Sequence, residues 1–258
     1  MKKTLIFKFG TNLLTTEEGL LDLNNLRNLV YQIAEVHNSQ KYNIAIISSG
    51  AITCGAEHMK ITVSNIPEKQ AAAATGQPIL TQQYFKLFME KNITIAQLLL
   101  TKEGLHDSKR QLHANNTIHE LFNRNIIPII NENDTVAIDE IQFGDNDQLA
   151  CDVAELLDAN HLILLTNHHG LYNKNPEKHL DATLIGQIED VTPAIMALAD
   201  DSESSTSKGG MESKLLASKR ASQAGIDVTI AYGRSQTIIQ ECIDGNANAT
   251  KIIGKKGT

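Results

Sequence analysis

The stretch Ile44-Ala45-Ile46-Ile47-Ser48-Ser49-Gly50 decides the fold expected for this chain of 258 residues. A short apolar run, mostly of β-branched residues, passes directly into small polar residues. Such a run is typical of a strand buried on both faces of a sheet, and the Ser-Ser-Gly turn is typical of its end. Because Gly and Ser let backbone N–H groups face an anion, this turn is also a candidate ligand-binding edge.

Other strand-like runs end in a similar way. Residues 5–9 contain Lys8 and lead into Gly10, residues 126–130 lead into Asn-Glu-Asn-Asp at 131–134, and residues 162–165 lead into Thr166-Asn167. In an open parallel sheet these ends lie along one edge, where ligands bind. The sequence therefore predicts one site assembled from distant segments.

Strand-like and helix-like segments alternate through most of the chain. We expect strands at 5–9, 44–47, 93–100, 126–130, 162–165 and 228–231, a last edge strand at 251–253, and an antiparallel ribbon at 135–143. We expect helices at 68–90, with a break near 76–78, and at 214–224. Two more helices should follow caps at Asp22 and Asp147, and another should end at 117–123. This alternation predicts an α/β fold with helices on both faces of a mainly parallel sheet, and no linker divides residues 1–258.

Composition excludes several classes of protein. The net charge of −7 argues against a general nucleic-acid binder, since such proteins neutralise phosphates with a basic surface. No apolar run approaches the length of a membrane span or a signal peptide, so we expect no membrane association and a cytoplasmic location. The three cysteines are few, scattered and set among small or apolar residues, which favours buried thiols over disulfides.

Two lysines are candidates for anion binding. Lys8 interrupts an apolar strand, and Lys214 lies about one turn into a helix that follows Gly209-Gly210. Each has an ordinary alternative: Lys8 at a strand end that reaches water, and Lys214 as an exposed helical lysine. The adjacent glycines favour an anion site for both, because they expose backbone donors beside the charge.

Two acidic turns are further candidates. Gly144-Asp145-Asn146-Asp147 suits a turn followed by a helix N-cap, or a site that orients lysines or holds a metal-nucleotide. The segment 131–134 is either an ordinary polar turn or, if it lies on the ligand-binding edge of the sheet, a contact for the substrate. The segment 200–210 is either a disordered surface loop or a mobile lid. The sequence contains no P-loop, dinucleotide-binding or zinc-protease motif.

Taken together, these segments resemble the glutamate 5-kinases, of the amino acid kinase superfamily. The motifs run in family order: KFGT from Lys8, SSGAI from Ser48, NEND from Asn131, GDND from Gly144, GLY from Gly170 and GGMESK from Gly209. The resemblance implies a three-layer α/β/α sandwich around an open sheet of about eight strands. It also implies transfer of the γ-phosphoryl group of ATP to the side-chain carboxylate of L-glutamate, the first step of proline biosynthesis.

The resemblance also implies roles for individual residues. Lys8 and Lys214 would neutralise the transferring phosphoryl group, and Asp147 would hold both lysines. Glutamate would contact Ser49, Gly50, Asp134 and Asn146. The nucleotide would contact Lys8, Gly10, Thr166, Asn167, Lys208, Gly209, Gly210, Met211, Glu212, Ser213 and Lys214. Mg²⁺ would be carried by ATP rather than by a protein site. Partners would be glutamate, ATP, proline as a feedback inhibitor, and further copies of the chain in a dimer or tetramer.

Two departures from the family pattern are visible. The family usually has Thr-Asp where this chain has Thr166-Asn167, which changes a nucleotide contact by one negative charge. Many bacterial relatives carry a C-terminal PUA domain, and we expect none here. Rival hypotheses are a related kinase acting on carbamate, acetylglutamate, aspartate or a nucleoside monophosphate, and a non-catalytic binding module with the same fold.

Overall fold

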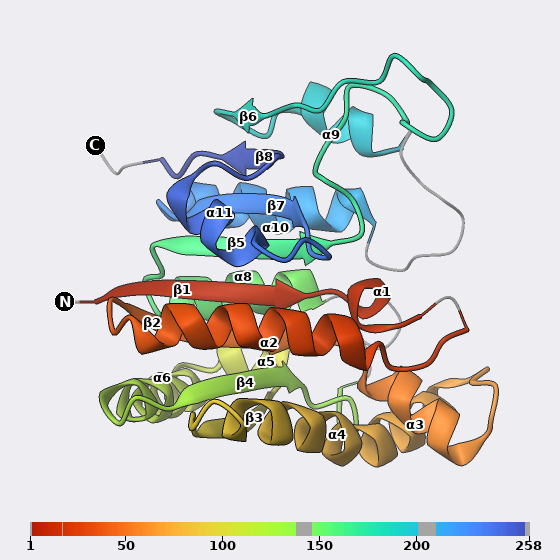
Figure 1. The fold of residues 1–258 in the computed structure, drawn as a ribbon, viewed down its shortest axis with the longest axis vertical. Coiled ribbons are helices and arrows are strands. Elements are labelled where there is room, and N and C mark those ends of the chain that lie inside the picture. Colours follow the sequence, from red (N-terminus) through yellow and green to blue (C-terminus); the bar gives the residue numbers. More distant parts are fainter. Residues whose placement is uncertain (1, 17, 138–145, 201–209, 256–258) are drawn as a thin grey trace.

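The computed structural model describes residues 2–16, 18–137, 146–200 and 210–255. The described strands form an eight-stranded sheet in the order β3-β4-β2-β1-β5-β7-β8-β6, and Figure 1 shows β1 near its middle. The strands are β1 (Lys3–Phe9), β2 (Tyr42–Ser48), β3 (Ile95–Leu100), β4 (Ile127–Glu132), β5 (His161–Thr166), β6 (Gln187–Ile188), β7 (Asp227–Tyr232) and β8 (Ala249–Ile252). The pairs from β3 to β7 are parallel, and β7 pairs antiparallel with β8.

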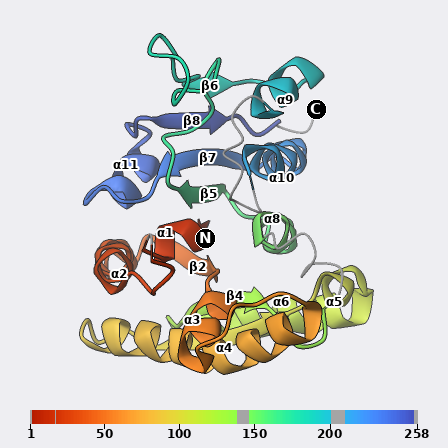
Figure 2. The same ribbon diagram turned by 90° about the vertical axis from the view of Figure 1, so that its right-hand side faces the viewer.

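Helices cover both faces of this sheet, as Figure 2 shows. One apolar cluster joins the sheet to α2 (Leu23–Asn38), α3 (Ala51–Met59), α4 (Ile66–Met89) and α11 (Ile238–Asp244). A second cluster joins the other face to α5 (Lys102–His106), α6 (Ser108–Asn123), α8 (Asn146–Leu156), α9 (Pro193–Asp200) and α10 (Met211–Gln223). The short α1 (Thr11–Leu14) follows β1 directly. The predicted three-layer α/β fold is confirmed.

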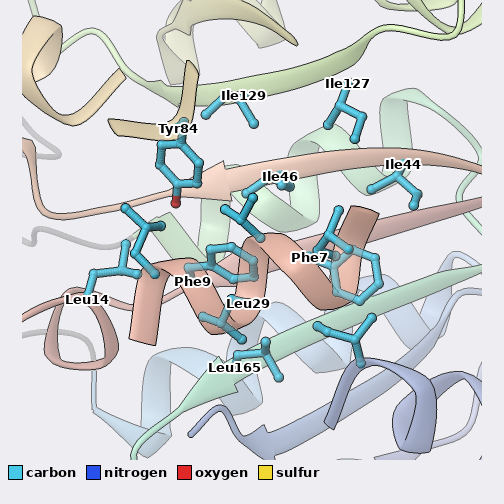
Figure 3. Packing of buried hydrophobic residues seen from close by; sticks show 14 of the residues in the cluster. Phe7, Phe9, Leu14, Leu29, Ile44, Ile46, Tyr84, Ile127, Ile129 and Leu165 are labelled. Atoms are coloured by element: carbon cyan, nitrogen blue, oxygen red, sulfur yellow. The ribbon is translucent and has the colours of Figure 1, made fainter. Parts of the chain in front are cut away.

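The register brings the strand ends together. Phe9 of β1 lies beside Ser48 of β2 and Leu165 of β5, while Ile47 of β2 lies beside Ile130 of β4. Residues that follow these four strands therefore share one edge of the sheet. The strands are aliphatic and buried on both faces, as the apolar runs predicted, and Figure 3 shows the packing on one face around Phe7, Ile46 and Ile129.

Some expected boundaries are wrong. Helix α4 runs unbroken through Pro78. Proline has no backbone N–H, so the carbonyl of Ala74 loses its helical hydrogen bond. The helix tolerates this loss because Ala74 and Pro78 are both exposed, and water can bond to that carbonyl. The strand expected at 251–253 is β8, which lies inside the sheet because β6 occupies the edge beyond it. Of the ribbon expected at 135–143, residues 135 and 136 lie in a turn and 138–143 lie outside the described residues.

The helices α3 and α4 touch at their backbones. A Cβ atom on Gly55 would lie 1.7 Å from the Ala72 carbonyl oxygen, and one on Gly76 would lie 1.9 Å from the Ala51 carbonyl oxygen. Only glycine permits this approach. The contact fixes the start of α3, and hence the turn after β2, against α4.

Candidate active site

Lys8 lies on the central strand, and its side chain points toward the α8–α10 layer. Strand residues alternate between faces, and its neighbour Ile6 belongs to the cluster packed against those helices. The side chain of Lys8 is only 6% exposed, and its Nζ lies 2.6 Å from Asp147 Oδ1. A buried ammonium needs such a partner. The alternative of a lysine that reaches water is therefore wrong.

Lys214 reaches the same carboxylate from the opposite direction. It lies in the first turn of α10, is buried, and places Nζ 3.0 Å from Asp147 Oδ2. The exposed-lysine alternative is also wrong. Asp147 thus receives one ammonium group on each carboxylate oxygen, and we call Lys8, Asp147 and Lys214 the charge triad.

Asp147 is fully buried in the first turn of α8. The expectation that it caps the helix is wrong, because α8 begins at Asn146 and the Asp147 side chain turns to the two lysines instead. Burial by itself raises the pKa of a carboxyl group, but Lys214 and Lys8 more than offset this and lower the pKa of Asp147 to about 2. The carboxylate therefore stays ionised near neutral pH.

A cleft of about 490 Å³ opens at the carboxyl edge next to these residues. It contains four residues predicted to bind substrate: Ser49, Gly50, Asp134 and Asn146. The other lining residues are Thr11, Ala51, Ile52, Thr53, Asn131 and Glu132. The structure thus brings together the ends of β1, β2 and β4 and the start of α8. We call this cleft the acceptor pocket.

The local conformation of the acceptor pocket follows from its sequence. Gly50 has a φ of 100°, which non-glycine residues rarely adopt, and it ends the turn at the start of α3. Asn146 Nδ2 lies 2.8 Å from the Ser48 carbonyl oxygen, 3.0 Å from Ser49 Oγ and 2.8 Å from Asn131 Oδ1. The two hydrogens of this amide are therefore shared among three acceptors. One amide fastens the start of α8 to β2 and β4.

The predicted nucleotide contacts lie along the same edge. The Gly10 amide donates to the Leu165 carbonyl at 3.3 Å, which fixes the turn after β1 beside the end of β5. Thr166 ends β5, and Asn167 Nδ2 donates to the Asn12 carbonyl at 2.9 Å. Asn167 therefore ties the end of β5 to α1.

The start of α10 supplies four more of the predicted nucleotide contacts. Gly210 precedes the helix, and Met211, Glu212 and Ser213 form its first turn with Lys214. Free N–H groups at a helix start favour anions. Lys208 and Gly209 lie outside the described residues.

Sequence reasoning missed the tie between the two helices that carry the charge triad. Arg220 of α10 donates to Asp152 Oδ1 at 2.7 Å and to Glu155 Oε2 at 2.9 Å, both on α8. Arg220 also donates to Gln148 Oε1 at 3.2 Å. The spacing of Gln148, Asp152 and Glu155 places them on one helical face, and this pattern is a signal that could have indicated the contact.

Within the described part of the chain, no group of three or more His, Cys, Asp or Glu residues is placed to hold a metal ion. The same residues include no helix long and apolar enough to cross a membrane. The structure presents a cationic pair held by a carboxylate, beside a polar cleft.

Comparison with known proteins agrees with this architecture. Residues 3–232 match the amino acid kinase family. A glutamate 5-kinase from Clostridium tetani is 42% identical over 250 residues, covering 96% of this chain and 93% of that protein. A glutamate 5-kinase from Nitrosomonas eutropha is 41% identical over 253 residues, covering 97% of this chain and 68% of that protein.

Solved structures of lower sequence identity show the same fold. Carbamate kinase from Giardia lamblia bound to AMP-PNP is 20% identical, with a TM-score of 0.67, covering 98% of this chain and 99% of that one. UMP kinase from Ureaplasma parvum is 13% identical, with a TM-score of 0.65 and the same coverage of both chains. The family resemblance expected from the motifs is confirmed: the chain belongs to the amino acid kinase family and, within it, to the glutamate 5-kinases.

Proposed function

We propose that this chain transfers the γ-phosphoryl group of ATP to the side-chain carboxylate of L-glutamate, forming L-glutamyl 5-phosphate in the first step of proline biosynthesis. One observation carries the proposal beyond family membership. Two buried lysines converge on Asp147 at 2.6 and 3.0 Å, directly beside a cleft that contains Asp134 and Asn146. That arrangement suits the reaction of an anionic donor with an anionic acceptor.

The acceptor pocket offers groups for an amino acid. We assign the α-ammonium group of glutamate to Asp134, a carboxylate that lines this pocket, since a charge-assisted hydrogen bond is the strongest contact available to it. Ser49 supplies a hydroxyl group for its carboxylates, whereas Asn146, whose amide hydrogens are already engaged, has its Oδ1 left as an acceptor. With the substrate held at these points, its side-chain carboxylate would be directed toward the charge triad.

The charge triad suits phosphoryl transfer. A carboxylate oxygen of glutamate attacks the γ-phosphorus, the bond from that phosphorus to the β–γ bridging oxygen breaks, and ADP leaves with the electron pair. The attacking oxygen is already ionised, so no general base is required. Lys8 and Lys214 would offset the charge that gathers on the transferring group, and Asp147 would keep them oriented. Mg²⁺, bound to the ATP phosphates, would supply further charge neutralisation.

An ADP-release assay with a panel of acceptors tests this proposal. We expect turnover with ATP and L-glutamate, and little or none with acetylglutamate, aspartate, carbamate or UMP. The product is identified by trapping the acyl phosphate with hydroxylamine as a hydroxamate. Turnover with another acceptor and none with glutamate would refute the assignment, and absence of turnover with every acceptor would favour a binding module.

Two further properties rest on the family resemblance alone. We propose that the chain assembles into dimers or tetramers and that proline inhibits it. Light scattering measures the assembly, and the ADP-release assay with added proline measures the inhibition. A monomer in solution, or turnover unchanged by proline, would contradict the respective statement.

A further inference from the structure

Helix α4 supports the acceptor pocket through two polar side chains on its sheet-facing surface. Ala73, Leu80 and Tyr84 of this surface are buried, and Gln77 lies on the same face because it is spaced four residues from Ala73 and seven from Tyr84. Figure 3 shows Tyr84 in the aliphatic cluster with Ile46 and Ile129. Polar groups on such a surface need partners.

Both polar groups have partners at the ends of strands. Gln77 Oε1 accepts from Asn131 Nδ2 at 2.8 Å, one residue before the end of β4. The Tyr84 hydroxyl lies 2.9 Å from Ser48 Oγ, at the end of β2. Asn131 and Ser48 also provide two of the three acceptors for the Asn146 amide. The five residues thus form a chain of hydrogen-bonded contacts that begins and ends on α4.

Two backbone groups set the direction of these bonds, because the Glu132 amide can only donate to Asn131 Oδ1 and the Ser48 carbonyl can only accept from Asn146 Nδ2. Gln77 Nε2 donates to Thr81 Oγ1 at 3.2 Å, which leaves Gln77 Oε1 to face Asn131. Asn131 must then present Nδ2 to Gln77 and Oδ1 to Asn146. Asn131 Oδ1 also accepts from the Glu132 amide at 2.9 Å. An amide turned the other way would place two donors or two acceptors face to face.

We propose that Gln77 is a positioning residue for the acceptor substrate: by accepting from Asn131 Nδ2 it holds the Asn131 side chain, and through it the Asn146 amide, in place at the acceptor pocket. Gln77 does not line this pocket, so it acts without touching the substrate. The proposal rests on the proposed function, because it takes the ligand of the pocket to be glutamate. In chemical terms, the Asn146 side chain that lines the pocket is supported from α4 through Asn131.

The test compares steady-state constants for glutamate and for ATP in Gln77→Met, Thr81→Val and the double variant. Gln77→Met leaves Asn131 Nδ2 without its acceptor, so we expect KM for glutamate to rise about tenfold. KM for ATP and kcat should stay within about twofold, because the charge triad is untouched. Thr81→Val should raise KM for glutamate by about threefold alone and have no further effect in the Gln77→Met background.

Gln82→Met is the matched control, since Gln82 lies on the same helix but is exposed. It should leave every constant unchanged. Thermal unfolding is measured for each variant, and a purely structural role would lower Tm without separating the two KM values. If Gln77→Met does not fold, the milder Thr81→Val carries the comparison.

Two failures are distinguishable. If the wild-type protein does not phosphorylate glutamate, the proposed function fails. If the wild type is active and Gln77→Met keeps the wild-type KM for glutamate, or raises both KM values equally, the positioning role is refuted.

Discussion

Lys8 and Lys214 lie on a central strand and on a helix near the other end of the chain, yet they bond to the two oxygens of a single carboxylate. Lys8 Nζ lies 2.6 Å from Asp147 Oδ1, and Lys214 Nζ lies 3.0 Å from Asp147 Oδ2. Because the carboxylate has no exposed surface, its charge is offset mainly by these two ammonium groups. The triad carries a net positive charge, which is what an anionic transition state requires.

Replacing either lysine should affect turnover more than substrate binding. For Lys8→Met and Lys214→Met we expect kcat to fall by about 10²–10³-fold, the usual effect of removing one group that stabilises developing charge. KM for glutamate should change by only a few-fold, because the interaction strengthens mainly in the transition state. Steady-state ADP release measures both constants. A variant with near-normal kcat would contradict the assignment of that lysine.

Asp147 should contribute to stability in a pH-dependent way. Burial raises the pKa of Asp147, but the two lysines lower it by more, and the resulting pKa is about 2, below the ordinary value of 3.8. A depressed carboxyl pKa stabilises the folded state above pH ~4, and this contribution is lost as the pH falls toward 2. Urea unfolding at pH 6, 4 and 3 should therefore show a steeper loss of unfolding free energy for the wild type than for Asp147→Asn. Parallel curves for the two proteins would count against an ion pair that is intact at neutral pH.

Asp134 should control recognition of the amino group. We expect Asp134→Asn to raise KM for glutamate by roughly 10–100-fold, since a hydrogen bond to a charged group contributes about 1.5–3 kcal/mol. KM for ATP should change little. As a second readout, glutarate lacks the α-amino group, so the variant should discriminate less than the wild type between glutamate and glutarate. Equal discrimination by both proteins would exclude Asp134 as the partner of the ammonium group.

The backbone contact between α3 and α4 should tolerate no side chain. The nearest atoms to a Cβ on Gly76 are backbone atoms of α3, which cannot move aside as a flexible side chain would. We expect Gly76→Ala to lower the free energy of unfolding by about 1–3 kcal/mol, the usual effect of overpacking. Gly186→Ala is the control, because a Cβ there meets no atom within 4 Å and its φ is ordinary. Urea denaturation compares the two, and equal stability would show that the helices can separate without loss.

Much of the fold could be predicted from the sequence because buried parallel strands leave a strong signal. The aliphatic runs of β1, β2, β4, β5 and β7 are short, β-branched and bounded by polar turns. The continuity of α4 through Pro78 could not be read in this way, because it depends on Ala74 facing solvent. The place of β8 inside the sheet depends on a two-residue strand, β6, whose signal is too short to detect.

The candidate site, like the fold, could be predicted from the sequence only in part. The positions of Lys8, Asp147 and Lys214 could be singled out from motifs, but no spacing rule brings such distant residues onto one carboxylate. That requires knowing that β1 lies beside β5 and that α8 packs against α10. Gln77 gave no signal at all, because a glutamine in a helix is ordinary and its role depends on facing the end of β4.

The order in which the triad's members occur along the chain has a consequence for biosynthesis. A ribosome makes Lys8 first, Asp147 near the midpoint and Lys214 late, and domains generally fold as units during synthesis. Until α8 has left the ribosome, the Asp147 carboxylate that pairs with the buried Lys8 ammonium in the folded protein is not available to it. We therefore expect closure of the sheet around Lys8 to be unfavourable before Asp147 is made, so that the segment that completes this part of the core also completes the charge triad.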